Sequence, residues 1–330
     1  MSNRNTAPLG LDVGTSRLVV ARRSEEEFQF ESQLNAFVDI PFSKMTESVL
    51  KKEHVPHAVE GTRMLVYGNE SQRFASMLNT EIRRPMTRGV INPGEPDSIK
   101  LIRELVNSLT GKNAQKGQKV CFSVPAAPLG SEESISYHEA TVKQVLNDLG
   151  FQGTSINEGL ATVYAEMEDS NYSGIGISCG GGLCNVCMAY LAVPLVSFSI
   201  AKAGDFIDHN AASATGERAN RIRIMKEQSF YLNGASSDKV QHVLGVYYDD
   251  MIHGLVNALN EAVTRNAPKF TQAVPMVLSG GTVMPKGFRD RFEKILQESG
   301  FPIELTEIRL ARDPLTATAR GALVSALSEE

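Results

Sequence analysis

The sequence predicts an α/β protein made of two domains with similar architecture. At 330 residues the chain is longer than one ordinary hydrophobic core supports. Each half begins with short strands in hairpins and continues with helices that alternate with strands, although the two halves share no visible sequence repeat. Glycine-containing corners follow strand-like segments at Asp12–Thr15, Gly180–Gly182 and Gly280–Thr282.

The first half opens with a hairpin over Leu9–Arg22, whose turn contains Gly14, Thr15 and Ser16. Apolar spacing then predicts strands at Phe28–Asp39, Arg63–Gly68, Val120–Val124 and Thr154–Asn157, and helices at Asn69–Leu78, Asp97–Leu109, Ser136–Leu149 and Glu158–Met167. The intervening segment Lys44–Gly61 is polar and irregular, which predicts a solvated loop.

The second half begins with Ile175–Asp208, the stretch with the clearest pattern. It predicts a strand, a tight turn at three glycines, a second strand, a turn or edge at Pro194, a third strand, and a corner at Gly204 and Asp205. The remaining predicted elements are helical sequence up to Gly216, helices at Glu217–Gln228, Tyr247–Asn266, Phe288–Leu296 and Thr316–Leu327, and strands at Val274–Leu278 and Ile303–Leu305.

The glycine corners are typical of phosphate sites. Glycine lacks a Cβ, so backbone N–H groups at such a corner can approach a ligand closely. Asp12 suits a phosphate corner mainly if a divalent cation lies between the two, because like charges otherwise repel. A plain hairpin with turn-forming residues explains any single corner equally well, and it is the occurrence of three that favours a phosphate site.

Composition excludes several other classes of function. The net charge of −5 and the absence of a basic arm argue against nucleic acid as a partner. The cysteines Cys184 and Cys187 form a C-x-x-C pair without a second pair or a histidine cluster, so small buried hydrophobes in a reducing compartment are expected. No signal peptide is expected, the apolar run Val186–Ile200 is too short to span a bilayer, and residues 1–8 give no sign of direct membrane insertion. The predicted location is the cytoplasm.

Seven segments, in this order, resemble the superfamily of actin, DnaK-type chaperones and sugar kinases, and within it the bacterial actins of the MreB and MamK type. They are LGLDVGTSRLVVARR at 9–23, RMLVYG at 63–68 with RRPMTRGVIN at 83–92, INEGLATVYAE at 156–166, AGDFID at 203–208, MKEQ at 225–228, VLSGGTVMPKG at 277–287 and RDPLTATARGALV at 312–324. The resemblance covers nearly the whole chain.

The resemblance implies an actin-like ATPase fold, in which two RNase-H-like domains flank a nucleotide cleft that holds ATP (or ADP) and Mg²⁺. The implied domain I is 1–171 with an inserted subdomain around 30–85, domain II is 172–309 with an insertion around 209–270, and 310–330 is a C-terminal helix returning to domain I. Asp12 would hold the metal through water. The implied nucleotide contacts are Gly14, Thr15, Ser16, Gly180, Gly181 and Gly182 to phosphates, Gly204, Asp205 and Lys226 near the ribose, Arg223 on the adenine side, and Gly280, Gly281 and Thr282 against the base.

The chain departs from the family at the second phosphate loop, which in relatives reads D-x-G-G-G-T-x-D. Here both carboxylates are lost, to Ser178 and Asn185, and the threonine is Leu183. Ser178 can hydrogen-bond a metal-bound water but brings no charge, so nucleotide binding is expected to survive better than hydrolysis. The water-activating residue is expected between Gly130 and Ala140, where the candidates are Glu132, Glu133, His138 and Glu139. Of these, Glu139 is our predicted catalytic residue, beside Asp12 and Ser178.

The predicted function is a nucleotide-binding bacterial actin homologue that self-associates into cytoskeletal filaments, with weakened ATP hydrolysis. The alternative is a pseudo-ATPase, a non-hydrolysing adaptor or scaffold that signals to a protein cargo or partner by domain closure. Filament subunits need contacts that do not close into a ring. Lys44–Gly61 and the cluster RANRIR at 218–223 are candidate contact surfaces, although solvated segments explain both equally well.

Overall fold

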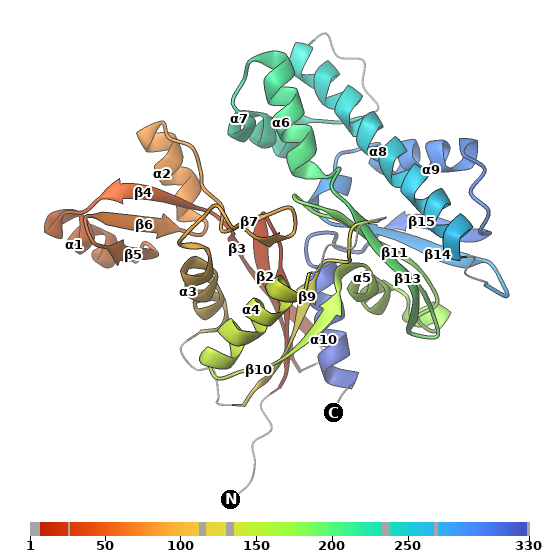
Figure 1. Cartoon of the computed structure of the whole chain (residues 1–330), viewed down its shortest axis with the longest axis horizontal. Coiled ribbons are helices and arrows are strands. Elements are labelled where there is room, and N and C mark those ends of the chain that lie inside the picture. Colours follow the sequence, from red (N-terminus) through yellow and green to blue (C-terminus); the bar gives the residue numbers. More distant parts are fainter. Residues whose placement is uncertain are drawn as a thin grey trace, which may run out of the picture.

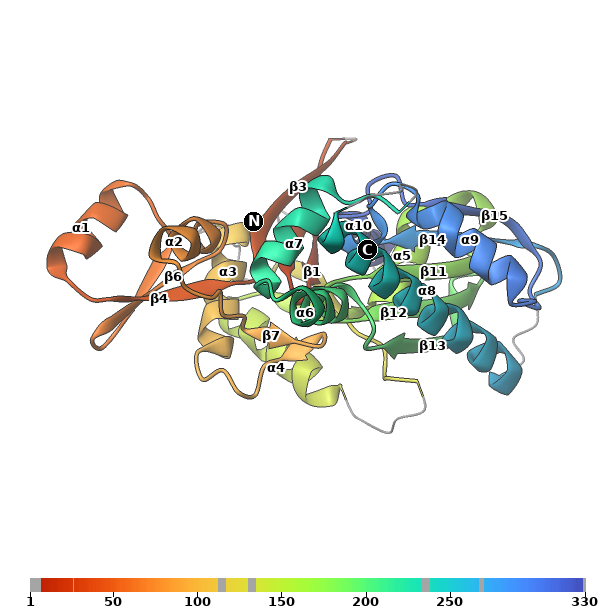
Figure 2. The same ribbon diagram turned by 90° about the horizontal axis from the view of Figure 1, so that it is seen from above.

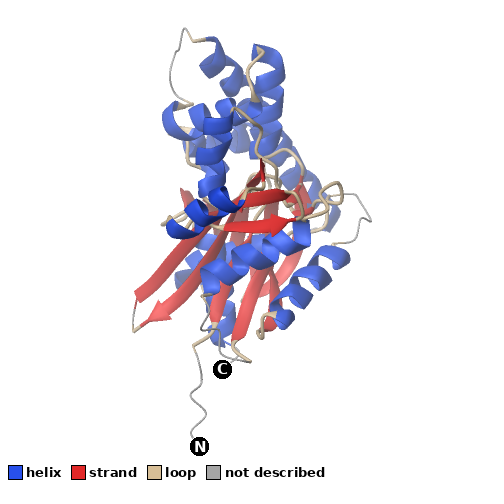
Figure 3. Ribbon diagram, turned by 90° about the vertical axis from the view of Figure 1, so that its left-hand side faces the viewer, coloured by secondary structure: helices blue, strands red, loops and turns tan. Residues whose placement is uncertain are grey.

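The structure is a computed structural model that describes residues 7–25, 27–111, 117–129, 135–232, 238–266 and 270–328. Over these residues it forms two large sheets with covering helices, and a smaller sheet that projects to one side (Figures 1 and 2). The strands gather in the lower part of the molecule, below a mostly helical part (Figure 3).

The two large sheets have the same plan, which confirms the predicted duplication. Each starts with three consecutive antiparallel strands and adds two strands parallel to the first of them. The first sheet has the order β10-β9-β1-β2-β3 and the second the order β13-β12-β11-β14-β15. We call each large sheet with the helices that cover it a lobe.

The first lobe is built around β1 (Leu9–Val13), β2 (Arg17–Ser24), β3 (Glu27–Leu34), β9 (Lys119–Val124) and β10 (Gln152–Asn157). Helices α3 (Ser98–Thr110) and α4 (Ser136–Asp148) bury their apolar faces against one side of this sheet. A short ribbon, β7 (Met86–Thr87) with β8 (Val90–Ile91), precedes α3 in the chain.

The second lobe is built around β11 (Gly174–Cys179), β12 (Cys184–Tyr190), β13 (Val193–Ile200), β14 (Val274–Ser279) and β15 (Leu305–Leu310). One face carries α6 (Gly204–Thr215), α7 (Ala219–Ser229), α8 (Lys239–Asn266) and α9 (Phe288–Glu298). Pro194 lies in β13, an edge strand, where a missing N–H costs no ladder bond inside the sheet. Among the described helices, none is long and apolar enough to cross a membrane.

The small sheet corrects one prediction. It has the order β4-β6-β5, and its members are β4 (Phe37–Pro41), β5 (His57–Glu60) and β6 (Arg63–Tyr67), with α1 (Lys44–Lys52) and α2 (Glu70–Leu78) beside them. The segment predicted to be a loop therefore contains α1 and β5. Ser43 caps α1 by accepting from the Thr46 N–H (3.0 Å), and Leu50 is its buried residue, so local capping rather than apolar spacing specifies this helix.

Three further boundaries differ from prediction. The segment predicted as one strand at Phe28–Asp39 is divided between β3 and β4, which belong to different sheets. The strand predicted at Ile303–Leu305 begins instead at Leu305, where pairing with β14 starts, and α8 begins eight residues before Tyr247. Strand pairing sets the boundaries of the two strand segments, whereas α8 starts where the Asp238 side chain accepts a hydrogen bond from the Gln241 N–H (2.9 Å).

Two helices form the seam between the lobes. Helix α5 (Glu158–Glu166) packs on the second sheet, and α10 (Ala317–Ser328) packs on the first, through apolar clusters on the faces opposite α3 and α8. The two helices touch at Gly321, where a Cβ would overlap the carbonyl group of Ala161. A backbone-to-backbone approach of this kind requires glycine. The last helix therefore returns from the second half of the chain to the first sheet, and the predicted domain boundaries stay a prediction.

Replacing this glycine should destabilise the whole protein. We expect Gly321→Ala to lower the free energy of unfolding by about 1–3 kcal/mol or more, because backbone atoms of α5 cannot yield without separating the two helices. The matched control is Gly245→Ala in α8, where a Cβ meets no atom within 4 Å and should stabilise by about 0.5–1 kcal/mol. Urea unfolding measures both changes. A Gly321→Ala variant as stable as the wild type would show that the contact between α5 and α10 does not require glycine.

Candidate functional site

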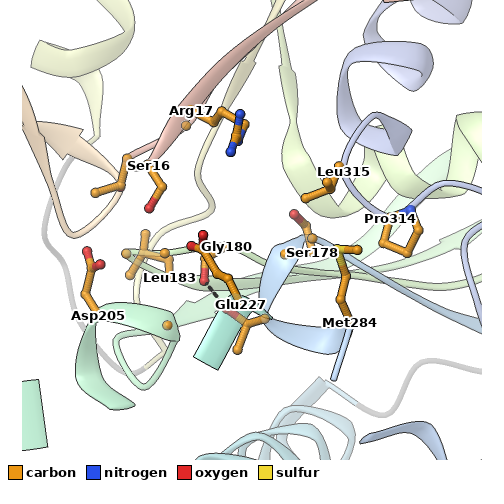
Figure 4. Close-up of a pocket in the computed structure, with 18 of the residues that line it drawn as sticks. Ser16, Arg17, Ser178, Gly180, Leu183, Asp205, Glu227, Met284, Pro314 and Leu315 are labelled. Atoms are coloured by element: carbon orange, nitrogen blue, oxygen red, sulfur yellow. Dashed lines mark hydrogen bonds between the residues drawn. The ribbon is translucent and has the colours of Figure 1, made fainter. Parts of the chain in front are cut away.

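A cavity of about 380 Å³ lies between the two lobes, and both lobes line it. Ser16 and Asp205 lie on one side, and Met284, Pro314 and Leu315 on the other (Figure 4). The lining includes these predicted site residues: Asp12, Gly14, Thr15, Ser16, Ser178, Gly180, Gly181, Gly182, Gly204, Asp205, Arg223, Lys226, Gly280, Gly281 and Thr282. The structure therefore brings together all three glycine corners.

The loops Asp12–Arg17 and Gly180–Leu183 touch each other across the cavity. A Cβ on Gly181 would overlap Ser16 Oγ, and a Cβ on Gly182 would lie 2.5 Å from Thr15 Oγ1 and 2.6 Å from the Gly89 nitrogen. Two of the three glycines are thus needed for the contact between lobes, whatever ligand the cavity holds. Leu183, which replaces the family's threonine, is buried beside Gly89.

Four backbone amides at this contact have no partner within the described residues: those of Thr15, Ser16, Gly181 and Gly182. Three other amides near the contact are used. Gly14 N–H donates to Arg17 O (3.1 Å), Gly180 N–H to Leu183 O (2.9 Å), and Gly204 N–H to Gly180 O (3.1 Å). Unpaired amides in two loops that line the same cavity are available as hydrogen-bond donors, which suits an anion such as a phosphate group.

Side chains hold the two lobes together beside the loops. Arg84, in the connection between α2 and β7, donates to Asp205 of the second lobe (2.7 Å) and to Ser16 Oγ of the first (3.3 Å). Farther out, Arg218 Nη1 donates to Asn79 Oδ1 (2.8 Å) and Asn220 Nδ2 to Glu81 Oε2 (3.0 Å). Part of the RANRIR cluster therefore faces the same chain across the cleft.

Glu158 is a buried carboxylate in the cavity that sequence reasoning did not select. It is the first residue of α5, placed by Asn157, whose side chain caps the helix by accepting from the Gly159 and Leu160 amides (2.9 and 3.2 Å). Its Oε2 accepts hydrogen bonds from Asn185 Nδ2 (2.9 Å) and Ser178 Oγ (3.3 Å). An acidic residue directly after a strand and an Asn cap was the signal that could have revealed it.

Glu158 and Asp12 form a pair of interacting acids. Burial, followed by the charge of Asp12, raises the pKa of Glu158 to about 8, against the opposing hydrogen bonds from Ser178 and Asn185. Burial also raises the pKa of Asp12 to about 6, while the hydrogen bond from Ser123 (2.7 Å) lowers it. Such groups are typical of sites that exchange protons or hold a cation. Ser178 therefore contacts Glu158, where the sequence suggested a metal-bound water.

Of the residues proposed between Gly130 and Ala140, neither Glu139 nor His138 lines the cavity. Glu139 is on α4 and accepts from Ser155 Oγ, and it does not line the cavity. His138 is buried, its ring nitrogens have no hydrogen-bond partner within the described residues, and burial lowers its pKa to about 4. Glu132 and Glu133 lie outside the described residues.

The basic side chains on the opposite side of the cavity differ in how closely they pair with acidic residues. Lys226 Nζ pairs with Asp208 (2.7 Å) and donates to the Gly204 carbonyl (3.1 Å), and both side chains are buried. Arg223 is buried 4.0 Å from Glu227, and burial and the nearby charge of Arg84 lower its pKa. Thr282 Oγ1 donates to Gly180 O (2.7 Å), so this predicted base contact also ties two glycine corners together.

The donor set fits a magnesium ion better than a protein-bound metal cluster. Among the described residues, no group of three or more His, Cys, Asp or Glu side chains could hold a metal. Magnesium usually keeps several waters and uses one or two carboxylates together with phosphate oxygens. Asp12, which has one carboxylate oxygen bonded to Ser123, could hold such an ion beside a phosphate.

The raised pKa of Glu158 should make the stability of the ligand-free protein depend on pH. The folded protein keeps a proton on Glu158 up to about pH 8, whereas the unfolded chain releases it near 4.5, so the free energy of unfolding falls as pH rises between these values. Glu158→Gln keeps an oxygen acceptor for Asn185 and Ser178 and should flatten this dependence. Thermal unfolding at pH 5, 6.5 and 8 measures it. Glu139→Gln, outside the cavity, is the control and should keep the wild-type profile, and equal profiles for all three proteins would contradict the assignment.

The chain matches one family model and is similar in fold to solved structures. The family model described as Volactin matches residues 8–326. One similar solved structure is a MamK double helical filament, whose chain has 19% sequence identity to this one and superposes with a TM-score of 0.71. Another is a non-polymerising MamK mutant bound to AMPPNP, with 19% sequence identity and a TM-score of 0.58. Each match covers 98% of this chain and 98% of the other chain. No curated protein sequence matches the chain. The predicted actin-like fold is thus confirmed, and the chain belongs to the Volactin family.

Proposed function

We propose that the protein binds a nucleoside di- or triphosphate, ATP or ADP with Mg²⁺, in the cavity between its lobes, and assembles into filaments. The observation that carries the proposal is the set of four unpaired amides of Thr15, Ser16, Gly181 and Gly182, contributed by two loops from opposite lobes. A phosphate on these amides would join the lobes, so ligand and lobe closure would stabilise each other. The MamK mutant of similar fold is bound to AMPPNP, which supports this choice of ligand.

The remaining predicted roles are part of the proposal. Asp12 would hold the magnesium ion. When bound, this ion would neutralise part of the negative charge of the phosphates. Arg223 and Lys226 would lie on the ribose and base side, with Gly280, Gly281 and Thr282 against the base. The domain boundaries at 171/172 and 309/310 and a cytoplasmic location complete the proposal.

Glu158 is the carboxylate best placed to orient a water for hydrolysis. It lines the cavity, it is held by two neutral donors, and its raised pKa leaves it able to accept or hold a proton near neutral pH. We propose it for this role in preference to Glu139, which the cavity does not include.

Self-association is supported by exposed apolar side chains at two distant places. Met45 is 80% exposed on α1, beside the small sheet, and Val193 is 59% exposed at the first residue of β13 (Figure 1). Different surfaces at opposite ends of a subunit are what an open, head-to-tail assembly requires. The solved MamK filament of similar fold supports this part of the proposal.

A nucleotide-binding scaffold without turnover is the second candidate, favoured by the loss of both carboxylates at Ser178 and Asn185. If the first proposal holds, protein mixed with Mg²⁺ and ATP pellets on high-speed centrifugation, filaments are visible by electron microscopy, and phosphate is released. Filaments without phosphate release would favour the scaffold. GTP and nucleotide-free samples run in parallel identify the base and the ligand dependence.

A surface variant separates assembly from binding. We expect Met45→Asp to abolish pelleting, because it places a charge in an apolar contact, while nucleotide affinity measured by calorimetry is unchanged. Lys52→Asp, at the last residue of the same helix, controls for a change of charge near the contact and should reduce pelleting less. If Met45→Asp forms as many filaments as the wild type, α1 is not part of the contact between subunits.

A further inference from the structure

Arg17 lies at the start of β2, directly after the first glycine corner, and its main chain is firmly held. Its carbonyl accepts from the Gly14 N–H (3.1 Å), and the residue pairs with Leu34 of β3. Val19, two residues along and on the same face of the strand, also lines the cavity. The Arg17 side chain extends over the space between Ser16 and Leu315 (Figure 4).

The Arg17 guanidinium has no hydrogen bond or ion pair with any residue that the structure describes. The other cations around the cavity are occupied or peripheral. Lys226 is paired with Asp208, Arg84 with Asp205, and Lys286 is exposed. Arg223 lies 4.0 Å from Glu227. Arg17 is therefore the available full positive charge beside the unpaired amides.

The acidic groups at this end of the cavity have no basic partner of their own. Asp12 and Glu158 are bonded to hydroxyl and amide groups only, with no basic side chain among their described partners. A polyphosphate brought to the amides of Thr15 and Gly181 would meet these carboxyl groups, and backbone amides offer only partial charges. The second phosphate loop also lacks a hydroxyl donor that the resembling family has, because Leu183 replaces the family's threonine.

We propose that Arg17 binds the polyphosphate of the nucleotide and compensates for the donors that the second loop lacks. The inference rests on the proposed nucleotide site and adds the residue that supplies its positive charge. A planar guanidinium can donate two parallel hydrogen bonds to phosphate oxygens, which a lysine cannot. Arg17 is thus expected to favour di- and triphosphates over nucleosides.

The test compares the binding of MgADP and MgAMPPNP to wild type, Arg17→Ala, Arg17→Gln and Arg17→Lys by calorimetry. Arg23→Ala, at the other end of the same strand and outside the cavity, is the matched control. We expect Arg17→Ala and Arg17→Gln to weaken both ligands about ten- to a hundred-fold, as for loss of a charged hydrogen bond, with partial recovery in Arg17→Lys. Arg23→Ala should bind like wild type.

A salt series separates contact from a merely structural role. If Arg17 touches phosphate, the decrease in affinity between 50 and 300 mM KCl is steeper in wild type than in Arg17→Gln. Affinities within two-fold of wild type for Arg17→Ala and Arg17→Gln would overturn the inference. The inference would also be overturned if Arg17→Ala and Arg17→Gln bind more weakly but the salt dependence is unchanged and Arg17→Lys shows no recovery. Failure of the wild type itself to bind either ligand would refute the proposed nucleotide site, a result distinguishable from these.

Discussion

The structure depends on the direct contact between two backbone loops, Asp12–Arg17 of the first lobe and Gly180–Leu183 of the second. Gly181 and Gly182 permit this contact, because a Cβ on either would strike Ser16 or Thr15. The same contact leaves four amides unpaired in residues that line one cavity. Buried or partly buried donors without partners are costly, so this arrangement is more favourable with an anion bound than without one.

The seam between α5 and α10 explains how the two loops meet. Each helix packs on a different sheet, and their close approach at Gly321 fixes the sheets relative to each other. Helix α5 also carries Glu158 at its first position, so one element both joins the lobes and supplies a cavity carboxylate. The packing that sets the lobe geometry therefore also sets the position of Glu158 relative to Ser178 and Asn185.

The sequence was sufficient to predict the duplicated α/β fold, because glycine position and apolar spacing are local signals. The meeting of the three glycine corners followed from the resemblance to the actin-like family. The sequence was insufficient for features that depend on distant contacts. Glu158 becomes buried beside Asp12 only when the two lobes come together, and its place after a strand and an Asn cap does not by itself specify that burial. The local signal for α1 is weak because its apolar residues Met45 and Val49 are exposed and only Leu50 is buried. The position of Glu139 outside the cavity depends on how α4 packs in the folded protein.

An experimental structure of the protein crystallised with Mg²⁺ and AMPPNP tests the central claim most directly. The account predicts phosphate oxygens within hydrogen-bonding distance of the amides of Thr15, Ser16, Gly181 and Gly182, with density for a metal ion beside Asp12. A nucleotide bound elsewhere, or loops that move apart so that these amides face solvent while the ligand is bound, would contradict it.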